Sequence, residues 1–131
     1  MDISIIIFLL GGLFLGWSLG ANDAANVFGT AVGTRMVRFK TAAIVCSIFV
    51  ILGAIISGSG TTETLGKLGA INALPGAFAA CVAAGVSVYL MTKAGLPVST
   101  TQAIVGAIVG WNLYTGSDTN IRVLITILGT W

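Results

Sequence analysis

The sequence predicts an all-α integral membrane protein in which some helices are broken or re-entrant. Of its 131 residues, 56% are hydrophobic and 8% are charged, and the mean hydropathy is +1.05. These charges are too few to cover the surface of a soluble globule. The apolar residues form stretches close to the roughly 20 residues that a helix needs to cross a bilayer. Two of these stretches contain polar motifs, which is why we expect irregular helices among them.

We expect one transmembrane domain over residues 1–131. Its segments are a first helix over 3–34 that breaks near Gly20, spans at about 41–57 and 74–91, a re-entrant or spanning segment over 95–116, and the start of a further helix at 121–131. As one helix, the first segment would be about 48 Å long, against a hydrocarbon core of about 30 Å. Gly20 is the natural break, because glycine is permissive and the following Asn22 and Asp23 can cap a new helix.

The charges between these segments predict an orientation. A basic cluster follows the first hydrophobic region, made of Arg35, Arg38 and Lys40. The positive-inside rule then places the N-terminus outside and makes the Gly/Thr-rich stretch 58–72 an external loop. Beyond Lys93, segment 95–116 either crosses the membrane or dips in and returns. Arg122 favours the return weakly, and a re-entrant segment would mark a cavity.

Several classes of function are excluded by what the sequence lacks. It contains no histidine, and Cys46 and Cys81 match no metal or redox spacing. We therefore expect no enzyme and no cofactor. The formal net charge of +2 is small and scattered, which argues against a nucleic-acid partner.

The first polar motif is Gly20-Ala-Asn-Asp-Ala-Ala-Asn26. In a helix that resumes after Gly20, Asn22 and Asn26 share a face, and Asp23 lies three positions before Asn26. These side chains would present oxygen ligands to the bundle interior. They could instead only cap a helix and join neighbouring helices, as small polar residues in membranes do. A carboxylate is costly in lipid, however, and this favours a functional site.

The second polar motif is Gly95-Leu-Pro-Val-Ser-Thr-Thr-Gln102. Pro97 interrupts the chain ahead of a helix that begins near Thr100, with Ser99 as N-cap and Gln102 at the third position. This is a capping-box pattern, and ordinary capping would explain it. A helix N-terminus with free N–H groups and hydroxyls is also a ready anion site.

Neither motif-bearing stretch has an interior lysine or arginine. An anion at that depth would rely on helix N-termini, hydroxyls, amides and a co-bound cation. Asp23 would repel the anion unless it were protonated or covered by a cation such as sodium. The sequence therefore indicates cation-coupled anion binding on broken helices, as in secondary transporters.

With both motifs in this order, the chain resembles the inorganic phosphate transporter (PiT) family, whose members carry GANDxxN in an early helix and PVSTT followed by histidine or glutamine. The resemblance implies sodium- or proton-coupled uptake of inorganic phosphate by a multi-pass protein of the cell membrane. It implies substrate binding by Asp23, Ser99, Thr100 and Thr101, and cation binding, with sodium as a candidate, by Asn22, Asp23, Asn26 and Gln102. Gln102 stands where many members have histidine, which favours sodium over protons as the coupling ion.

Members of that family carry two such halves in inverted orientation, whereas this chain contains one. The resemblance therefore implies one inverted-repeat half, which needs a missing second repeat or a second copy of itself, and we expect no transport by the monomer. A transporter of sulfate or another oxyanion stays open as an alternative. So do a helix-packing subunit that transports nothing and a small pore-forming oligomer.

Overall fold

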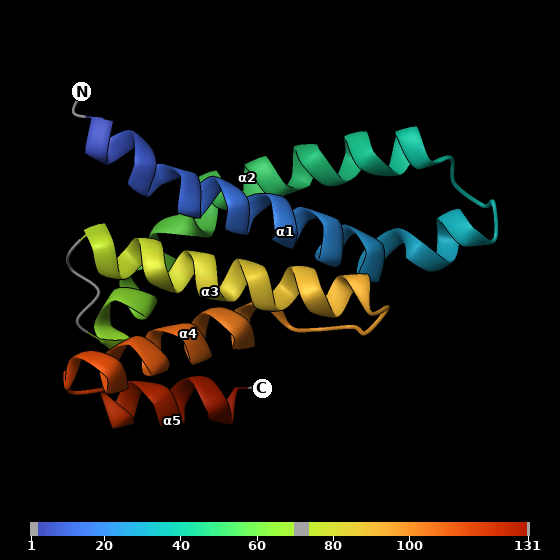
Figure 1. The fold of residues 1–131 in the computed structure, drawn as a ribbon. Coiled ribbons are helices and arrows are strands. Elements are labelled where there is room, and N and C mark those ends of the chain that lie inside the picture. Colours follow the sequence, from blue (N-terminus) through green and yellow to red (C-terminus); the bar gives the residue numbers. More distant parts are fainter. Residues whose placement is uncertain (1–2, 70–73, 131) are drawn as a thin grey trace.

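The computed structural model describes residues 3–69 and 74–130 of the chain. This part is helical, without strands, as expected (Figure 1). The helices are α1 (Ile3–Gly33), α2 (Phe39–Leu68), α3 (Leu74–Lys93), α4 (Thr100–Thr115) and α5 (Ile121–Gly129). Among them, α1, α2 and α3 are long and apolar enough to cross a membrane.

Helix α1 is continuous through Gly20, so the predicted break at this residue is wrong. A glycine inside a helix costs about 1 kcal/mol relative to alanine. Breaking the helix in an apolar environment would instead leave several backbone groups unpaired, at a few kcal/mol each. Continuing the helix is therefore the cheaper solution. The excess length appears as an overhang, because α1 extends well beyond the end of α3 (Figure 1).

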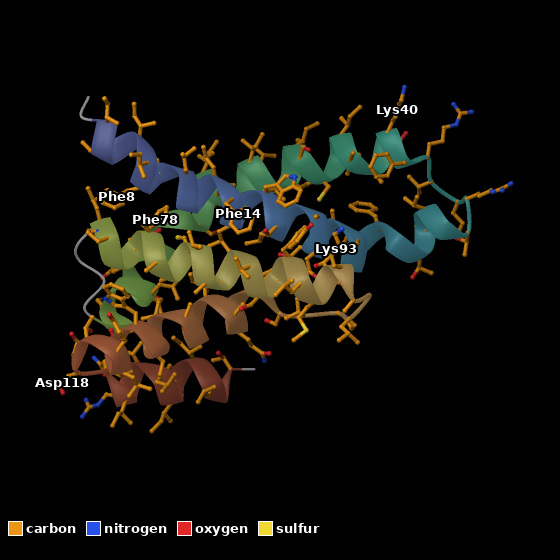
Figure 2. All side chains as sticks on the ribbon, in the orientation of Figure 1. Phe8, Phe14, Lys40, Phe78, Lys93 and Asp118 are labelled. Carbon is orange, nitrogen blue, oxygen red and sulfur yellow. The ribbon has the colours of Figure 1, made fainter. Side chains whose placement is uncertain are left out.

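Helices α1 and α3 run side by side in the same direction and form the most extensive interface. The rings of Phe8 and Phe78 lie 5.8 Å apart near one end, and those of Trp17 and Tyr89 lie 5.8 Å apart farther along. Buried Gly85 allows the close approach between them, because a Cβ atom there would lie 2.8 Å from the ring of Phe14. Figure 2 shows Phe8, Phe14 and Phe78 along this interface.

Glycines also recur at four-residue spacing on α1 and α4, but these are not the glycines at the helix contacts. Added Cβ atoms would meet nothing within 4 Å at Gly12, Gly16, Gly20, Gly29, Gly33, Gly106 and Gly110. The close approaches occur instead at Gly11, Gly69, Gly76 and Gly85. The row on α1 therefore faces open space.

Helices α3 and α4 form a hairpin. A Cβ atom on Gly76, in the first turn of α3, would lie 2.9 Å from Nε1 of Trp111, near the end of α4. The outer ends of the two helices thus meet, and their connection lies partway along α1, which continues to Gly33 (Figure 1). The sequence predicted a re-entrant or spanning element within 95–116. In the structure, residues 95–99 form the turn of a hairpin whose arms are α3 and α4, and the position of this segment in the membrane stays a prediction. The loop after α4, which contains Asp118, lies at the opposite end of the molecule from Lys40 (Figure 2).

Helix α2 continues to Leu68, so the loop predicted over 58–72 is wrong for residues 58–68, and 70–73 lie outside the described residues. Helical spacing satisfies the polar side chains of this stretch. The hydroxyls of Thr62 and Thr64 donate to carbonyls four residues earlier, and Glu63 pairs with Lys67. The end of α2 joins a small core with α3 and α4, formed by Leu68, Ala80, Val105 and Ile108.

Candidate functional site

The two polar motifs meet where the α3–α4 turn lies against α1. The side-chain amide of Asn22 donates to the carbonyl oxygen of Val98 at 2.8 Å. The hydroxyl of Thr100 donates to Oδ2 of Asp23 at 3.2 Å. Residues more than 70 positions apart in the chain are thereby brought into one polar cluster.

Asn22 is the centre of this cluster. It is only 3% exposed, and its Nδ2 atom also donates to Oδ1 of Asp23 at 3.1 Å. Its Oδ1 atom accepts from the hydroxyl of Thr92 at 3.4 Å. A buried amide with partners on two other segments is held in one orientation, and it helps to orient the neighbouring carboxylate.

Sequence reasoning missed two members of the cluster, Thr92 and the carbonyl of Val98. A single threonine near the end of an apolar stretch carries no signal of its own. The one indication in the sequence is that Thr92 lies three residues before Gly95, where the chain reverses direction. Gly95 has a φ of +70°, a left-handed conformation that glycine adopts without strain, and this starts the turn.

The turn places the N-terminus of α4 next to Asp23. Ser99 is the N-cap of α4, with its hydroxyl accepting from the backbone N–H of Gln102 at 3.3 Å, so the predicted capping interaction is confirmed. The first turn of a helix carries unpaired N–H groups and a partial positive charge. Thr100, 8% exposed, begins this turn and points its hydroxyl at the carboxylate. A carboxylate and a positive helix end therefore face one another.

The remaining predicted site residues lie outside this cluster. Asn26 lies one turn beyond Asn22 on α1, and its side chain is exposed. Gln102 is also exposed, and its contact with the motif is the backbone capping bond. Thr101 points toward α2 and α5 rather than toward Asp23. The serine and threonines of the second motif thus have three separate environments.

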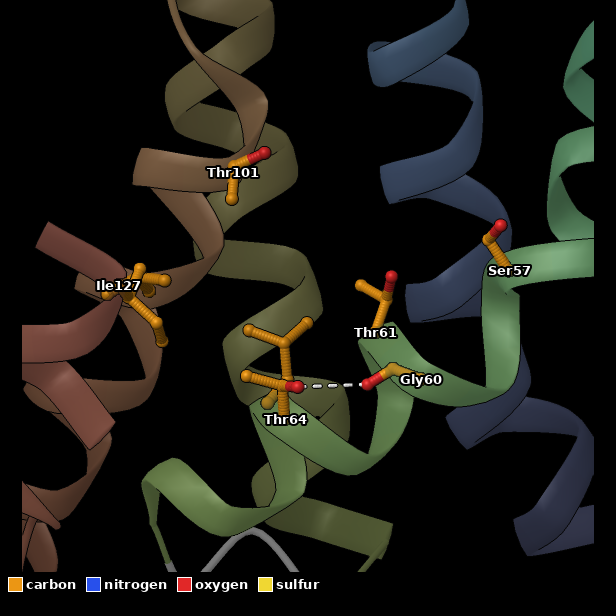
Figure 3. A pocket seen from close by; sticks show the side chains of 8 residues that line it. Ser57, Gly60, Thr61, Thr64, Thr101 and Ile127 are labelled. Carbon is orange, nitrogen blue, oxygen red and sulfur yellow. Dashed lines mark hydrogen bonds between the residues drawn. The ribbon is translucent and has the colours of Figure 1, made fainter. Parts of the chain in front are cut away.

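Thr101 lines a cleft of about 390 Å³ between α2, α4 and α5 (Figure 3). The lining residues are Ser57, Gly60, Thr61, Thr64, Leu65, Thr101, Val105 and Ile127. The hydroxyl of Thr64 is engaged with the carbonyl of Gly60 at 2.9 Å. The surface of this cleft is mostly apolar, and the hydroxyls of Ser57, Thr61 and Thr101 are polar groups at its lining.

Chemically, the Asp23 cluster gathers oxygen atoms and a helix N-terminus. Its oxygens come from a carboxylate, an amide, a backbone carbonyl and two hydroxyls, which are the ligands that hard cations prefer. The adjacent N–H groups of α4 can bind an anion. One place can thus hold a cation and an anion as neighbours.

Comparison with known proteins identifies the family of this chain. Residues 19–131 match the model of the phosphate transporter family. The chain belongs to this family. It therefore belongs to a family of transporters rather than of enzymes.

Several relatives, each bearing the name "Putative phosphate permease", illustrate the similarity. A protein of Pyrococcus furiosus is 36% identical over 141 residues, covering 99% of this chain and 34% of its own length. A protein of Pyrococcus abyssi is 39% identical, covering 90% of this chain and 31% of its own length. A protein of Chlamydia pneumoniae is 37% identical, covering 89% of this chain and 30% of its own length. The chain thus spans about a third of the length of these relatives. No solved structure matches it.

Proposed function

We propose that the protein carries inorganic phosphate across the cell membrane together with a cation, and that this cation is sodium. The observation that carries the proposal is the contact of Asp23 on α1 with Thr100 at the N-terminus of α4. A phosphate anion fits the N–H groups and hydroxyls of the helix start. The carboxylate beside it would repel phosphate unless a cation lay between them. Binding of the two ions is then mutually dependent, which is what coupled transport requires.

In this proposal the sodium ion is bound by Asp23 and the oxygen of Asn22. Phosphate is bound by the N–H groups at the N-terminus of α4 and by the hydroxyl of Ser99, while Thr100, whose hydroxyl donates to Asp23, lies between the two ions. Thr101 would contact phosphate from the cleft beside α2. Asn26 and Gln102 are exposed, and they would complete the cation site against a second half.

The need for a second half has its own support. The chain spans about a third of the length of its relatives, and two of the predicted site residues, Asn26 and Gln102, are exposed. On α1, Gly12, Gly16 and Gly20 are exposed and would admit another helix at close range. We therefore propose that this chain is one inverted-repeat half, completed by a second repeat or a second copy. The α3–α4 turn would lie at membrane depth, where irregular backbone must line a cavity or protein.

The test is uptake of labelled phosphate into proteoliposomes with and without an inward sodium gradient. The chain alone is compared with a chimera in which it replaces the matching third of the Pyrococcus furiosus relative. Saturable, sodium-dependent uptake that Asp23→Asn abolishes supports the proposal. Uptake driven by a proton gradient without sodium would show that the coupling ion is the proton and not sodium. Uptake of sulfate but not phosphate by the chimera would overturn the proposal that phosphate is the substrate.

A further inference from the structure

A second polar position lies next to the Asp23 cluster, on the other side of Thr92. It is a cleft of about 390 Å³ between α1 and α3, lined by Trp17, Ser18, Ala21, Tyr89, Thr92 and Lys93. Thr92 belongs to both places, because its hydroxyl donates to Asn22. The cleft is therefore one side chain away from the proposed transport site.

Ser18 gives the first sign that this cleft has a ligand. The residue is 2% exposed, and its hydroxyl has no hydrogen-bond partner in the described part of the chain. Burying a hydroxyl without a partner costs about 1–3 kcal/mol. A ligand that accepts a hydrogen bond at the back of the cleft would remove this cost.

Lys93 gives the second sign. The sequence places no cation inside either motif-bearing stretch, but the fold brings the end of α3 to the level of Asn22. The ammonium group of Lys93 lies 5.7 Å from the centre of the Tyr89 ring and forms no ion pair among residues 3–69 and 74–130. The side chain of Lys93 is exposed, so its ammonium group is available to pair with an anion bound in the cleft.

The charges around the cleft also favour a negatively charged ligand. None of the described residues that line it is acidic, and Asp23 directs Oδ2 toward Thr100 on α4. An anion here would meet the ammonium group of Lys93 and the free hydroxyl of Ser18, since the hydroxyl of Thr92 already donates to Asn22. A tetrahedral oxyanion can use both donors at once, whereas a cation would find no carboxylate among these lining residues.

We propose that Lys93 and Ser18 form, beside Thr92, a second binding position for a phosphate group, adjacent to the Asp23 cluster. The binding of a phosphate group at this position does not depend on the proposed transport function. Only its role as a position where the substrate waits before transport rests on that function. The group has two sources, free inorganic phosphate or the headgroup of an anionic phospholipid. Both present the same oxygens to the same two donors.

The test uses the fluorescence of Trp17, which lines the cleft. Trp111 and Trp131 are replaced by phenylalanine, and the purified protein is titrated with inorganic phosphate in a lipid-free detergent. A parallel arm compares vesicles of phosphatidylcholine with vesicles that also contain phosphatidylglycerol. We expect a saturable change in Trp17 emission in at least one arm, and the arm that responds identifies the source. No change in either arm would overturn the proposal.

Variants separate this position from the transport site. Lys93→Gln should weaken the Trp17 response about tenfold or more, and Ser18→Ala should weaken it less. Lys93→Arg should largely restore it, and Lys67→Gln, which removes an exposed lysine on α2, should leave it unchanged. The response should persist in Asp23→Asn, where transport is lost. If the protein transports phosphate but Lys93→Gln alters neither the response nor the KM for phosphate, this inference fails while the proposed function stands.

Discussion

The carboxylate of Asp23 accepts a hydrogen bond from the hydroxyl of Thr100, 77 residues farther along the chain, at 3.2 Å. This bond joins a continuous helix to the start of a helix in a reversing hairpin. Neither motif alone provides both a negative charge and a positive helix end. The contact is therefore the place where we propose that a cation and an anion are bound together.

The charge of Asp23 is the first feature to test. Asp23→Asn keeps the shape of the side chain and an oxygen for Thr100 but removes the negative charge. We expect sodium-dependent phosphate uptake to fall about 100-fold or more, because a charged ligand to the cation is lost. Asp118→Asn removes an exposed carboxylate in the loop after α4 and is the matched control. An Asp23→Asn protein with normal sodium-dependent uptake would show that the carboxylate does not bind the coupling ion.

The different directions of Thr100 and Thr101 predict different effects of the same substitution. Thr100→Val removes the hydroxyl bonded to Asp23, and we expect the KM for sodium to rise about tenfold. Thr101→Val removes a hydroxyl that lines the cleft beside α2, and the KM for sodium should change by less than about twofold. Thr100→Ser should retain most of the affinity. Equal effects of the two valine substitutions would contradict the geometry described above.

The sequence predicts this site better than it predicts the backbone that builds it. Asn22, Asp23, Ser99 and Thr100 are recognisable because polar groups are rare in apolar stretches. The start of α4 follows from Pro97 and the Ser99 cap, and the start and approximate end of α3 from its apolar run. Thr92 could not be predicted, because its role depends on the packing of α3 against α1.

Two errors in the predicted backbone share one physical cause. The expected break at Gly20 and the expected loop after Ser57 both treat glycine as a signal that ends a helix. In an apolar environment a continuous helix satisfies its own backbone groups, and this outweighs the cost of a single glycine. Local glycine content is therefore a weaker signal here than in a soluble protein.

Adjacent glycines on α1 give a matched test of the α1–α3 interface. A Cβ atom on Gly11 would lie 2.7 Å from the ring of Phe78 and 3.3 Å from its carbonyl oxygen, whereas one on Gly12 would meet nothing within 4 Å. We expect Gly11→Ala to lower the free energy of unfolding by about 1–3 kcal/mol. Gly12→Ala should leave it unchanged or raise it by up to about 1 kcal/mol. Thermal unfolding of the two variants in detergent measures the difference, and equal stabilities would argue against close packing at Gly11.

The side chain of Asn112 contributes to the contact between the end of α4 and the end of α2. Its side chain is fully buried, and its Nδ2 atom donates to the hydroxyl of Thr119 at 3.0 Å. It also packs so closely on Gly69 that no side chain would fit there. Next to it, the backbone N–H of Asn120 donates to the carbonyl of Leu68 at 3.0 Å. Asn112 thus supports the junction between α2 and the loop after α4.

Asn112→Ala should open a cavity and leave the hydroxyl of Thr119 without its donor, lowering the free energy of unfolding by about 2–4 kcal/mol. Hydrogen exchange at the Asn120 amide should become faster, because the bond to Leu68 loses its support. Leu113→Ala is the control, since its side chain is 77% exposed on the same helix. If exchange at Asn120 is as slow in Asn112→Ala as in this control, the junction is held by the apolar contacts of Leu68 and Ile108 instead.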